Sequence, residues 1–436
     1  MKEYIEIIKP RVMEGLELAK SLGASGASIS YSHSNSEGIG FESNRLKSGA
    51  AVESQNYAIN VIINHRSGTA SGNIPERLCD AVRSACELAK YGAASHFDEY
   101  PTPDKEFTPV KTYSDGVEAL NIDRQVADCQ EMIDRLLKED GELVAGADAS
   151  IEESEGFIAT SGGFSNSVKE SNWSLSCGFQ KTRGTDMLFA GSGRTWGELN
   201  SLYSKDAILE RCLFNLKHAA KIVTTESGIV PLIIPPYMIR KFLSPLASAI
   251  SGRSVAKGTS PLQDKLHTQC FAKNLTVLDN PHIDFAPSAC AHDSVGIPTE
   301  RRLLVEDGVL NYYLYDYDTA CMTGNAPTGN DGCSPYTMLV SPGTESSESL
   351  IRSVKKGIFV EQMLGFGQTN MENGDFSANL ALGFLVENGE IVGRVKNAMI
   401  SGNIFELLKG DLQFSSDVHP YNLQPYTIMP GVSLKV

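Results

Sequence analysis

Long apolar segments and paired cysteines are both absent from this sequence of 436 residues. No apolar run reaches the roughly 18–20 residues that a helix needs to cross a bilayer. The nine cysteines are scattered and include no CxxC pair, which a zinc ribbon or a thioredoxin-like site would require. The amino-terminal segment interrupts every short apolar run with Glu, Lys or Arg, unlike a signal peptide. We therefore expect a cytoplasmic protein with reduced thiols and no membrane partner.

Basic residues are also fewer than acidic ones: the chain has 38 Lys and Arg and 53 Asp and Glu, which gives a formal net charge of −15. Nucleic-acid binding depends on Lys and Arg displacing counterions from phosphates, so this acidic balance predicts no nucleic-acid partner. Histidines are few as well, and no two of the eight lie closer than His282 and His292. An HExxH-type zinc motif, which needs two histidines on one helix face, is therefore absent.

The remaining composition is that of an ordinary globular protein, with 41% hydrophobic and 21% charged residues. Single hydrophobic cores stop growing at roughly 250–300 residues, so a chain of this length should form two domains. We expect an α+β fold. Residues 1–225 should form a domain with an antiparallel sheet and helices, and residues 226–436 a β-rich domain that is barrel-like or sandwich-like.

Helical periodicity and strand alternation locate the elements of the first domain. Apolar residues at three- and four-residue spacing predict helices over 4–22, between Asn73 and Gly92, from Asp123 onward and over 205–223. Alternation of polar and apolar residues predicts strands over 27–33, 38–46 and 57–64, and more strands between 142 and 202. Clusters of Ser, Asn and Gly, such as the one at 34–37, are expected to separate the strands.

The second domain begins with a buried strand, 229–234, that ends at Pro235-Pro236 and leads into a helix over 237–250. Short strands then dominate, with one more helix at 404–409. Two hairpin turns are predicted at Asp307-Gly308 and Asn388-Gly389, because two-residue turns need the positive φ that these residue types tolerate.

Two stretches carry side chains that could support catalysis or metal binding. Ser254 and Lys257 match the SxxK pattern, in which the lysine helps to deprotonate the serine, although the accompanying SDN and KTG motifs are absent. A second stretch holds residue types that could converge on a metal, namely His282, Asp284, Cys290, His292 and Asp293. The simpler interpretations are a turn after a helix and a polar surface loop.

A third stretch, 322–335, is rich in glycine, which would let a backbone approach a peptide closely. Its candidate peptide-channel residues are Thr323, Gly324, Asn325, Thr328, Gly329, Asn330 and Cys333. Cys333 would act as a nucleophile only with a histidine partner, and the sequence places none nearby. A structural connection between strands is the alternative interpretation.

The order of the segments resembles the TldD/PmbA family, most closely its PmbA (TldE) branch, which carries the older label of modulator of DNA gyrase. The matching segments run through nearly the whole chain. They are SEGIGFESNRLKSGAAVES near the amino terminus, the central helix with Lys257-Gly-Thr-Ser260, Gly296-Ile-Pro-Thr-Glu300, Glu306-Asp-Gly308, Thr328-Gly-Asn330, Gly374-Asp-Phe-Ser377, Glu387-Asn-Gly389 and Ile400-Ser-Gly-Asn403.

The TldD members of this family are zinc peptidases with an HExxxH motif. Counted back from the shared KGTS segment, the two histidines of that motif correspond to Leu243 and Ser248, and the glutamate to Ser244. A family cysteine falls near Leu380. None of these residues supplies the imidazole, thiolate or carboxylate that zinc chemistry needs. The resemblance therefore implies a degenerate active site, with no catalytic residue, metal or cofactor in this chain.

The same resemblance implies a non-catalytic subunit of a zinc metallopeptidase. A TldD-like partner would hold the zinc, and the complex would process unfolded peptides of the antitoxin or peptide-antibiotic precursor type. A homodimer is a further expectation, because closed symmetric assemblies are common among soluble chains. Two alternatives stay open, a stand-alone hydrolase that uses Ser254 and Lys257 or the 282–293 loop, and a regulatory protein that binds DNA gyrase.

Overall fold

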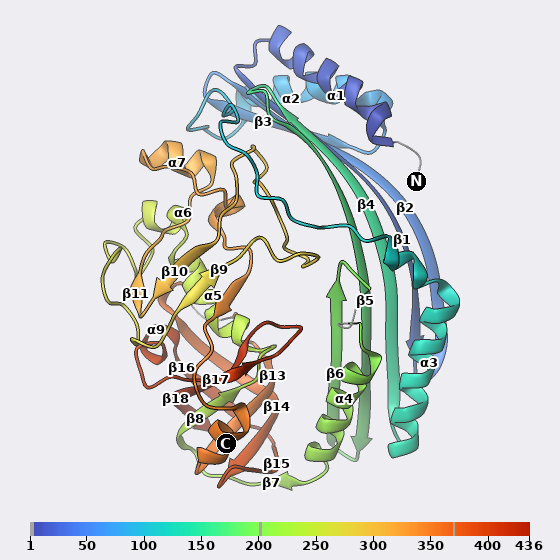
Figure 1. Cartoon of the computed structure of the whole chain (residues 1–436), viewed down its shortest axis with the longest axis vertical. Coiled ribbons are helices and arrows are strands. Elements are labelled where there is room, and N and C mark those ends of the chain that lie inside the picture. Colours follow the sequence, from blue (N-terminus) through green and yellow to red (C-terminus); the bar gives the residue numbers. More distant parts are fainter. Residues whose placement is uncertain (1–3, 200–202, 369–370) are drawn as a thin grey trace.

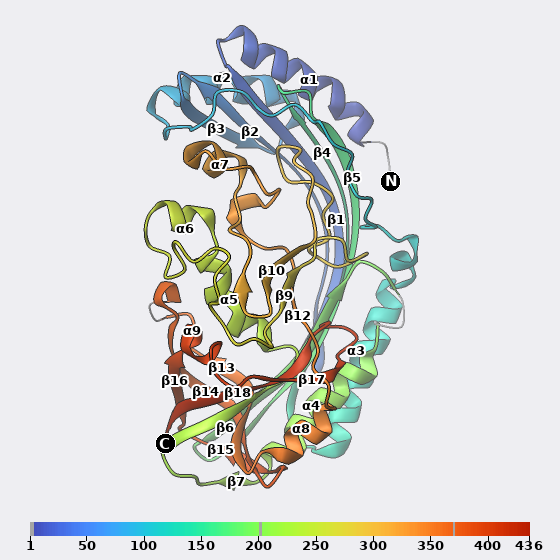
Figure 2. The ribbon, with the colours of Figure 1, turned by 60° about the vertical axis from the view of Figure 1, so that its left-hand side comes forward.

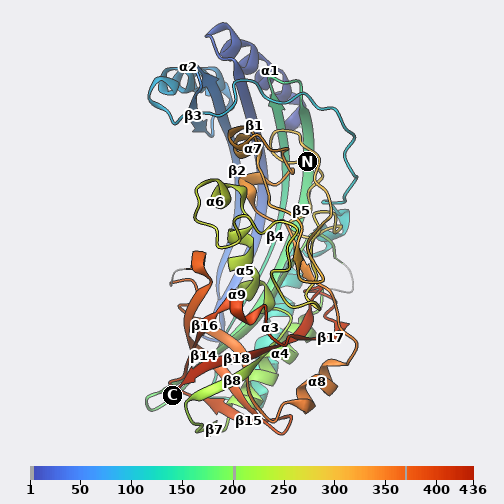
Figure 3. The ribbon, with the colours of Figure 1, turned by 90° about the vertical axis from the view of Figure 1, so that its left-hand side faces the viewer.

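The computed structural model describes residues 4–199, 203–368 and 371–436 of the chain. The amino-terminal half forms a six-stranded antiparallel sheet in the order β3-β2-β1-β4-β5-β6. Its strands are β1 (Gly26–Glu42), β2 (Arg45–Ile63), β3 (Arg66–Gly72), β4 (Val144–Thr160), β5 (Ser165–Arg183) and β6 (Asp186–Trp196). These strands curve along the length of the molecule (Figure 1). The carboxy-terminal half lies in front of them in the side view (Figure 3).

Strand β1 corrects the prediction of two strands separated at residues 34–37. The polar segment stays in the sheet because it is paired on both sides, as Ser34 is with Ser54 of β2 and Ser154 of β4. Pairing on both edges satisfies the backbone groups, so it overrides the turn preference of Ser and Asn. The true break lies later, at Ser43-Asn44, where both residues have positive φ.

Two pairs of helices cover one face of this sheet, one pair at each end (Figure 2). They are α1 (Tyr4–Ser21) with α2 (Leu78–Leu88), and α3 (Ile122–Glu139) with α4 (Lys205–Ala219). Short 3₁₀ turns flank them at η1 (Pro75–Arg77), η2 (Ala89–Tyr91) and η3 (Asp115–Ala119). Strand side chains alternate between faces, so Ile29 packs in the core beneath α1 while Ser28 and Ser30 line the opposite face. The four predicted helices are confirmed, although the fourth ends before residue 223.

The carboxy-terminal half contains a sheet that closes on itself. Strand β13 pairs with both β8 and β14, so β13-β8-β18-β16-β14 form a closed five-stranded barrel. The strands of this sheet are β7 (Ile222–Val223), β8 (Gly228–Ile234), β13 (Lys356–Leu364), β14 (Asp375–Glu387), β15 (Glu390–Val395), β16 (Met399–Asn403), β17 (Gln413–Val418) and β18 (Pro425–Lys435). The predicted α+β class with a barrel-like second half is confirmed.

A small four-stranded sheet and several short helices complete this half. The sheet has the order β11-β10-β9-β12 and comprises β9 (Val277–Asp279), β10 (Arg302–Glu306), β11 (Val309–Leu310) and β12 (Met338–Val340). The helical elements are α5 (Ile239–Ala249), α6 (Gly252–Ala256), α7 (Tyr317–Thr323), η4 (Asp331–Cys333), α8 (Ser347–Ser353), η5 (Met371–Asn373) and α9 (Ile404–Leu407). Both predicted hairpin turns are confirmed by positive φ at Asp307-Gly308 and Asn388-Gly389.

A shared core crosses the predicted domain boundary at residues 225 and 226. One cluster of buried side chains joins Met132 of α3 and Leu209 of α4 to Phe359 and Phe384 of the barrel. Strand β7, which precedes the boundary, pairs with β15 beyond it. The division into domains 1–225 and 226–436 stays a prediction. None of the helices in the described residues has the length and apolar character of a membrane span.

Candidate functional site

Helix α5 carries the positions at which the family resemblance places the missing zinc ligands. Leu243 is fully buried in the core of the carboxy-terminal half, and Leu380 of β14 belongs to the same core. Ser244 and Ser248 lie on the exposed side of the helix. Their hydroxyls donate to the backbone carbonyls of Lys241 and Ser244, at 2.7 and 3.3 Å. The two leucines therefore pack in the hydrophobic core, and the two serine hydroxyls form hydrogen bonds with the backbone of their own helix.

Zinc does not fit these residues. The ion takes three or four nitrogen, sulfur or carboxylate ligands that converge on one point. The α5 positions offer only aliphatic carbon and hydroxyl groups that already have acceptors. Across the described residues, no group of three or more His, Cys, Asp or Glu side chains is placed to hold a metal.

The candidate metal-binding stretch at 282–293 does not converge. His282 Nε2 lies 2.9 Å from the hydroxyl of Thr299. Asp284 Oδ1 accepts a hydrogen bond from the backbone N–H of Lys111 at 2.9 Å. Cys290 donates its S–H to the carbonyl of His292 at 2.7 Å. Each polar group therefore points to a different neighbour, and the stretch acts as a bridge between the two halves.

His292 connects the 282–293 stretch to the six-stranded sheet of the amino-terminal half. Its ring lies 4.9 Å from the rings of Phe107 and Phe164. Nδ1 contacts the carbonyl of Asp293 at 2.8 Å and must donate to it, so Nε2 accepts from the amide of Asn166 on β5 at 2.6 Å. With both ring nitrogens engaged, His292 has no lone pair left for a metal.

Asp293 differs from its neighbours because half of its carboxylate is unsatisfied. The residue is 2% exposed, and Oδ1 accepts from the backbone N–H groups of Val295 and Ile297 at 3.0 and 2.8 Å. Oδ2 is buried and has no hydrogen-bond partner among the described residues. Burial raises the pKa of Asp293 to about 7, the charge of Asp331 adds to the increase, and the backbone hydrogen bonds oppose it. The sequence around Asp293 gave no indication that its carboxyl would be buried with a raised pKa.

Ser254 and Lys257 do not form a catalytic pair. In the part of the chain that the structure describes, no hydrogen bond joins the serine hydroxyl to the lysine amine, and Lys257 is exposed. The backbone carbonyl of Ser254 instead accepts from the N–H of Thr259 at 3.0 Å. Ser254 lies within the short helix α6 and Lys257 is its carboxy-terminal cap, so a second helix stands where the simpler interpretation expected a turn after a helix.

The glycine-rich stretch is only partly an exposed loop. Thr323 ends α7, and Gly324 caps that helix with a left-handed φ of 70°. Asn330 is buried and donates to Asp279 Oδ2 at 3.1 Å. Cys333 is also buried, and its sulfur accepts from the backbone N–H of Asp316 at 3.3 Å. Gly324 and Asn325 are exposed, and contact between this stretch and a peptide stays a prediction.

A cavity of about 660 Å³, the inter-domain cavity, lies between the uncovered face of the long sheet and the loops of the carboxy-terminal half. Its sheet side is lined by polar residues of β1, β2 and β3, namely Ser28, Ser30, Asn60, Thr69 and Ser71. Its opposite side carries charged residues from separate segments of the chain, namely Arg253 of α6, Asp293, Asp316 and Asp318 at the start of α7, and Asp331 of η4. Sequence reasoning missed this set because its members come from segments far apart in the chain.

The carboxylates of the inter-domain cavity are held in place by neighbouring donors. Asp316 accepts from the N–H of Thr319 at 2.8 Å, which caps α7, and pairs with Arg253 at 2.8 Å. Asp318 accepts from the backbone N–H of His96 and contacts its Nδ1, both at 2.9 Å. Asp316 and Asp318 are therefore held on one wall of the cavity by neighbouring donors.

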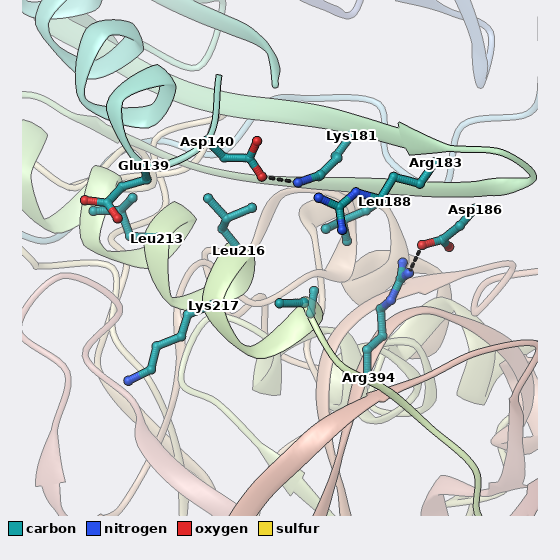
Figure 4. A pocket seen from close by; sticks show the side chains of 12 residues that line it. Glu139, Asp140, Lys181, Arg183, Asp186, Leu188, Leu213, Leu216, Lys217 and Arg394 are labelled. Carbon is teal, nitrogen blue, oxygen red and sulfur yellow. Dashed lines mark hydrogen bonds and ion pairs between the residues drawn. The ribbon is translucent and has the colours of Figure 1, made fainter. Parts of the chain in front are cut away.

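A second cavity, of about 600 Å³, lies where α4 meets the β5–β6 hairpin and β15 (Figure 4). Lys181 pairs with Asp140, and the hydrogen bond from Lys181 lowers the pKa of that carboxyl. Arg394 of β15 pairs with Asp186 of β6 at 2.5 Å. Burial opposes the shift at Asp186, but hydrogen bonds from Lys396 and Arg394 lower its pKa. Arg394 and Lys396 both pair with Asp186 and so join the two halves, and we interpret this cavity as a structural junction.

Another buried charge, Glu361 of β13, lies at the contact between α4 and the barrel. It is 4% exposed and accepts from Arg211 Nε at 3.0 Å, Asn215 Nδ2 at 2.8 Å and Tyr237 Oη at 2.6 Å. Burial raises the pKa of Glu361 and lowers that of Arg211, because each charged form loses hydration. Their direct contact opposes both shifts and favours the ion pair.

Comparisons with known proteins agree with the resemblance seen in the sequence. The family model of the PmbA/TldA metallopeptidase C-terminal domain matches residues 227–435, and that of PmbA/TldA metallopeptidase domain 1 matches residues 27–89. The Metalloprotease PmbA homolog of Haemophilus influenzae is 27% identical, over 98% of this chain and 96% of the relative.

Two solved structures share the fold over almost the whole chain. A Thermotoga maritima protein, proposed to be a modulator of a DNA gyrase, has a TM-score of 0.87 at 21% identity and covers 99% of this chain and 100% of its own. TldE from Thermococcus kodakarensis has a TM-score of 0.86 at 21% identity and covers 98% of this chain and 100% of its own.

Proposed function

The chain belongs to the PmbA/TldD metallopeptidase family, and from this premise we propose that it is a metal-free, TldE-like subunit of a zinc peptidase. A TldD-like partner supplies the metal, and the complex processes unfolded peptides in the cytoplasm. Helix α5 carries the proposal, because a buried leucine and two self-bonded serines stand where the family resemblance places the ligands.

The exposed face of α5 fits a role beside a peptide rather than in the reaction. Ser244 and Ser248 are small, and their hydroxyl protons are already donated to the helix backbone. They therefore add polar surface without a nucleophile or a proton acceptor of suitable pKa. In this proposal Leu243 and Leu380 mark the lost site from inside the core, and the serines border the space that the partner's substrate uses.

The test compares three samples, namely this chain alone, a TldD-like protein alone, and the two together. Zinc content is measured by mass spectrometry after exposure to excess zinc and washing, and cleavage is followed with an unfolded peptide. We expect well under one zinc per chain and no cleavage from this chain alone, and cleavage from the mixture. Stoichiometric zinc together with hydrolysis from this chain alone would refute the proposal.

Lys257→Ala is the matched control for that experiment. Lys257 is exposed and lies outside the contacts described for α5, so the variant should fold and leave the activity of the mixture unchanged. If this chain alone did cleave the peptide and Lys257→Ala abolished the cleavage, the SxxK hydrolase would replace the subunit proposal.

A further inference from the structure

We propose that the inter-domain cavity binds a positively charged group rich in N–H donors, an alkylammonium or a guanidinium, carried by a peptide side chain or by a free small molecule. The cavity lies within a single chain and needs no partner. This inference therefore stands or fails separately from the subunit proposal.

The charge of the lining residues favours a cation. Four aspartates line the cavity, and the cationic side chain among its lining residues, Arg253, is already paired with Asp316 at 2.8 Å. Outside the lining, Nδ1 of His96 lies 2.9 Å from Asp318 Oδ2. A concave site with one sign of excess charge concentrates ligands of the opposite sign. With Asp316 paired, the remaining negative charge resides on Asp318 and Asp331 and, when it is ionised, on Asp293.

Buried acceptors without donors give an independent reason to expect a ligand. Asp293, 2% exposed, lines the cavity with Oδ2 unpartnered within the described residues. On the sheet side, Asn60 donates through Nδ2 to Tyr100 at 3.0 Å, and its Oδ1 is likewise buried with no donor in the described chain. Unsatisfied buried acceptors are costly, so a ligand that brings N–H groups recovers that loss.

An aromatic wall suits the same class of ligand. Phe97, Tyr100 and Tyr317 all line the cavity, with ring centroids 5.2 Å apart for Phe97 and Tyr100 and 5.0 Å apart for Phe97 and Tyr317. Aromatic faces attract organic cations through the ring quadrupole. A bare metal ion fits less well, because the aspartates do not converge into a ligand group in the described residues.

The test is calorimetric titration of the full chain with three probes. They are the peptide Ac-Gly-Arg-Gly-NH2, the same peptide with uncharged citrulline in place of arginine, and agmatine as a free guanidinium. We expect the citrulline peptide to bind at least tenfold more weakly than the arginine peptide. Binding of agmatine alone would indicate a free small molecule, and binding of the arginine peptide alone would indicate a peptide side chain.

Variants decide whether the cavity is the binding site. Asp293→Asn keeps the backbone contacts of Oδ1 and should weaken binding of the charged probe about tenfold. Asp331→Asn, on an exposed residue, keeps a side-chain oxygen that can accept from the Oγ of Ser294 and should weaken binding severalfold even if the first variant folds poorly. Asp411→Asn, an exposed residue elsewhere, changes the net charge equally and should have no effect. Equal binding of the citrulline peptide, equal losses in the Asp411 variant, or no binding of any probe would overturn the inference.

Discussion

At the scale of single residues, burial decides which side chains Leu243 and Ser248 of α5 can be replaced by. Leu243 has no exposed surface, whereas Ser248, one and a half turns away, faces outward. The same helix therefore offers one position closed to polar side chains and one open to them. Restoring the family's motif would be a problem of packing as well as of ligand chemistry.

Leu243→His should lower the free energy of unfolding by about 2–4 kcal/mol, because it buries an imidazole without a partner and disturbs a packed core. Ser248→His, the matched control on the exposed face, should change stability by less than about 0.5 kcal/mol. Urea denaturation of both variants measures the difference. Similar midpoints for the two variants would show that Leu243 is not packed as described.

Asp293 makes stability depend on pH in the direction opposite to a salt-bridged carboxylate. Its folded pKa of about 7 lies above the unfolded value of 3.8, so the folded chain holds the extra proton between these values. Stability contributed by the neutral form is therefore lost as pH rises from about 4 through about 7. Asp293→Asn removes this dependence.

We expect Asp293→Asn to match the wild type below about pH 4 and to exceed it in unfolding free energy by a margin that grows up to about pH 7, reaching on the order of 1–4 kcal/mol at pH 8. Thermal denaturation across this pH range measures the change. Asp411→Asn is the control for net charge. A constant difference between variant and wild type at all pH values would contradict the raised pKa.

At the scale of elements, helix α4 is tied to the barrel by a buried ion pair. Glu361 receives donors from Arg211 and Asn215 of α4, and Arg211 also lies over the rings of Phe214 and Tyr237. Buried pairs of this kind contribute little net stability when intact, but removal of one partner leaves an uncompensated charge.

Arg211→Met should destabilise the chain by about 3–5 kcal/mol, whereas the double change Arg211→Met with Glu361→Gln should recover part of that loss. Hydrogen exchange should show that backbone amides of α4 and β13, where the pair lies, lose protection before those of other elements. No recovery in the double variant would mean that Arg211 acts through packing rather than through its charge.

At the scale of the whole molecule, the two halves share core contacts as well as surface contacts. Buried residues of α3, α4 and the barrel form one cluster, and β7 completes a sheet on the far side of the predicted boundary. The ion pair between Arg394 and Asp186 adds a polar contact at the same junction. Independent domains would instead meet at a limited and more polar interface.

The chain should therefore unfold in one cooperative transition, despite a length that suits two domains. Differential scanning calorimetry checks this, with the ratio of calorimetric to van't Hoff enthalpy close to one as the expected result. Two resolved transitions, or a stable proteolytic fragment ending near residue 225, would support independent domains instead.

Local patterns in the sequence determined the helices, the hairpin turns at Asp307-Gly308 and Asn388-Gly389, and the α+β class. These features depend on side-chain chemistry and on spacings of a few residues, which a sequence displays directly.

Only the tertiary structure decided that β1 continues through residues 34–37, that Cys333 is buried, and that the inter-domain cavity gathers aspartates from segments that are distant in the sequence. The ion pair of Arg211 with Glu361 was also decided by the tertiary structure, because the two residues are 150 positions apart in the sequence. Each depends on contacts between distant segments, which set burial and pairing but leave no periodic signal along the chain.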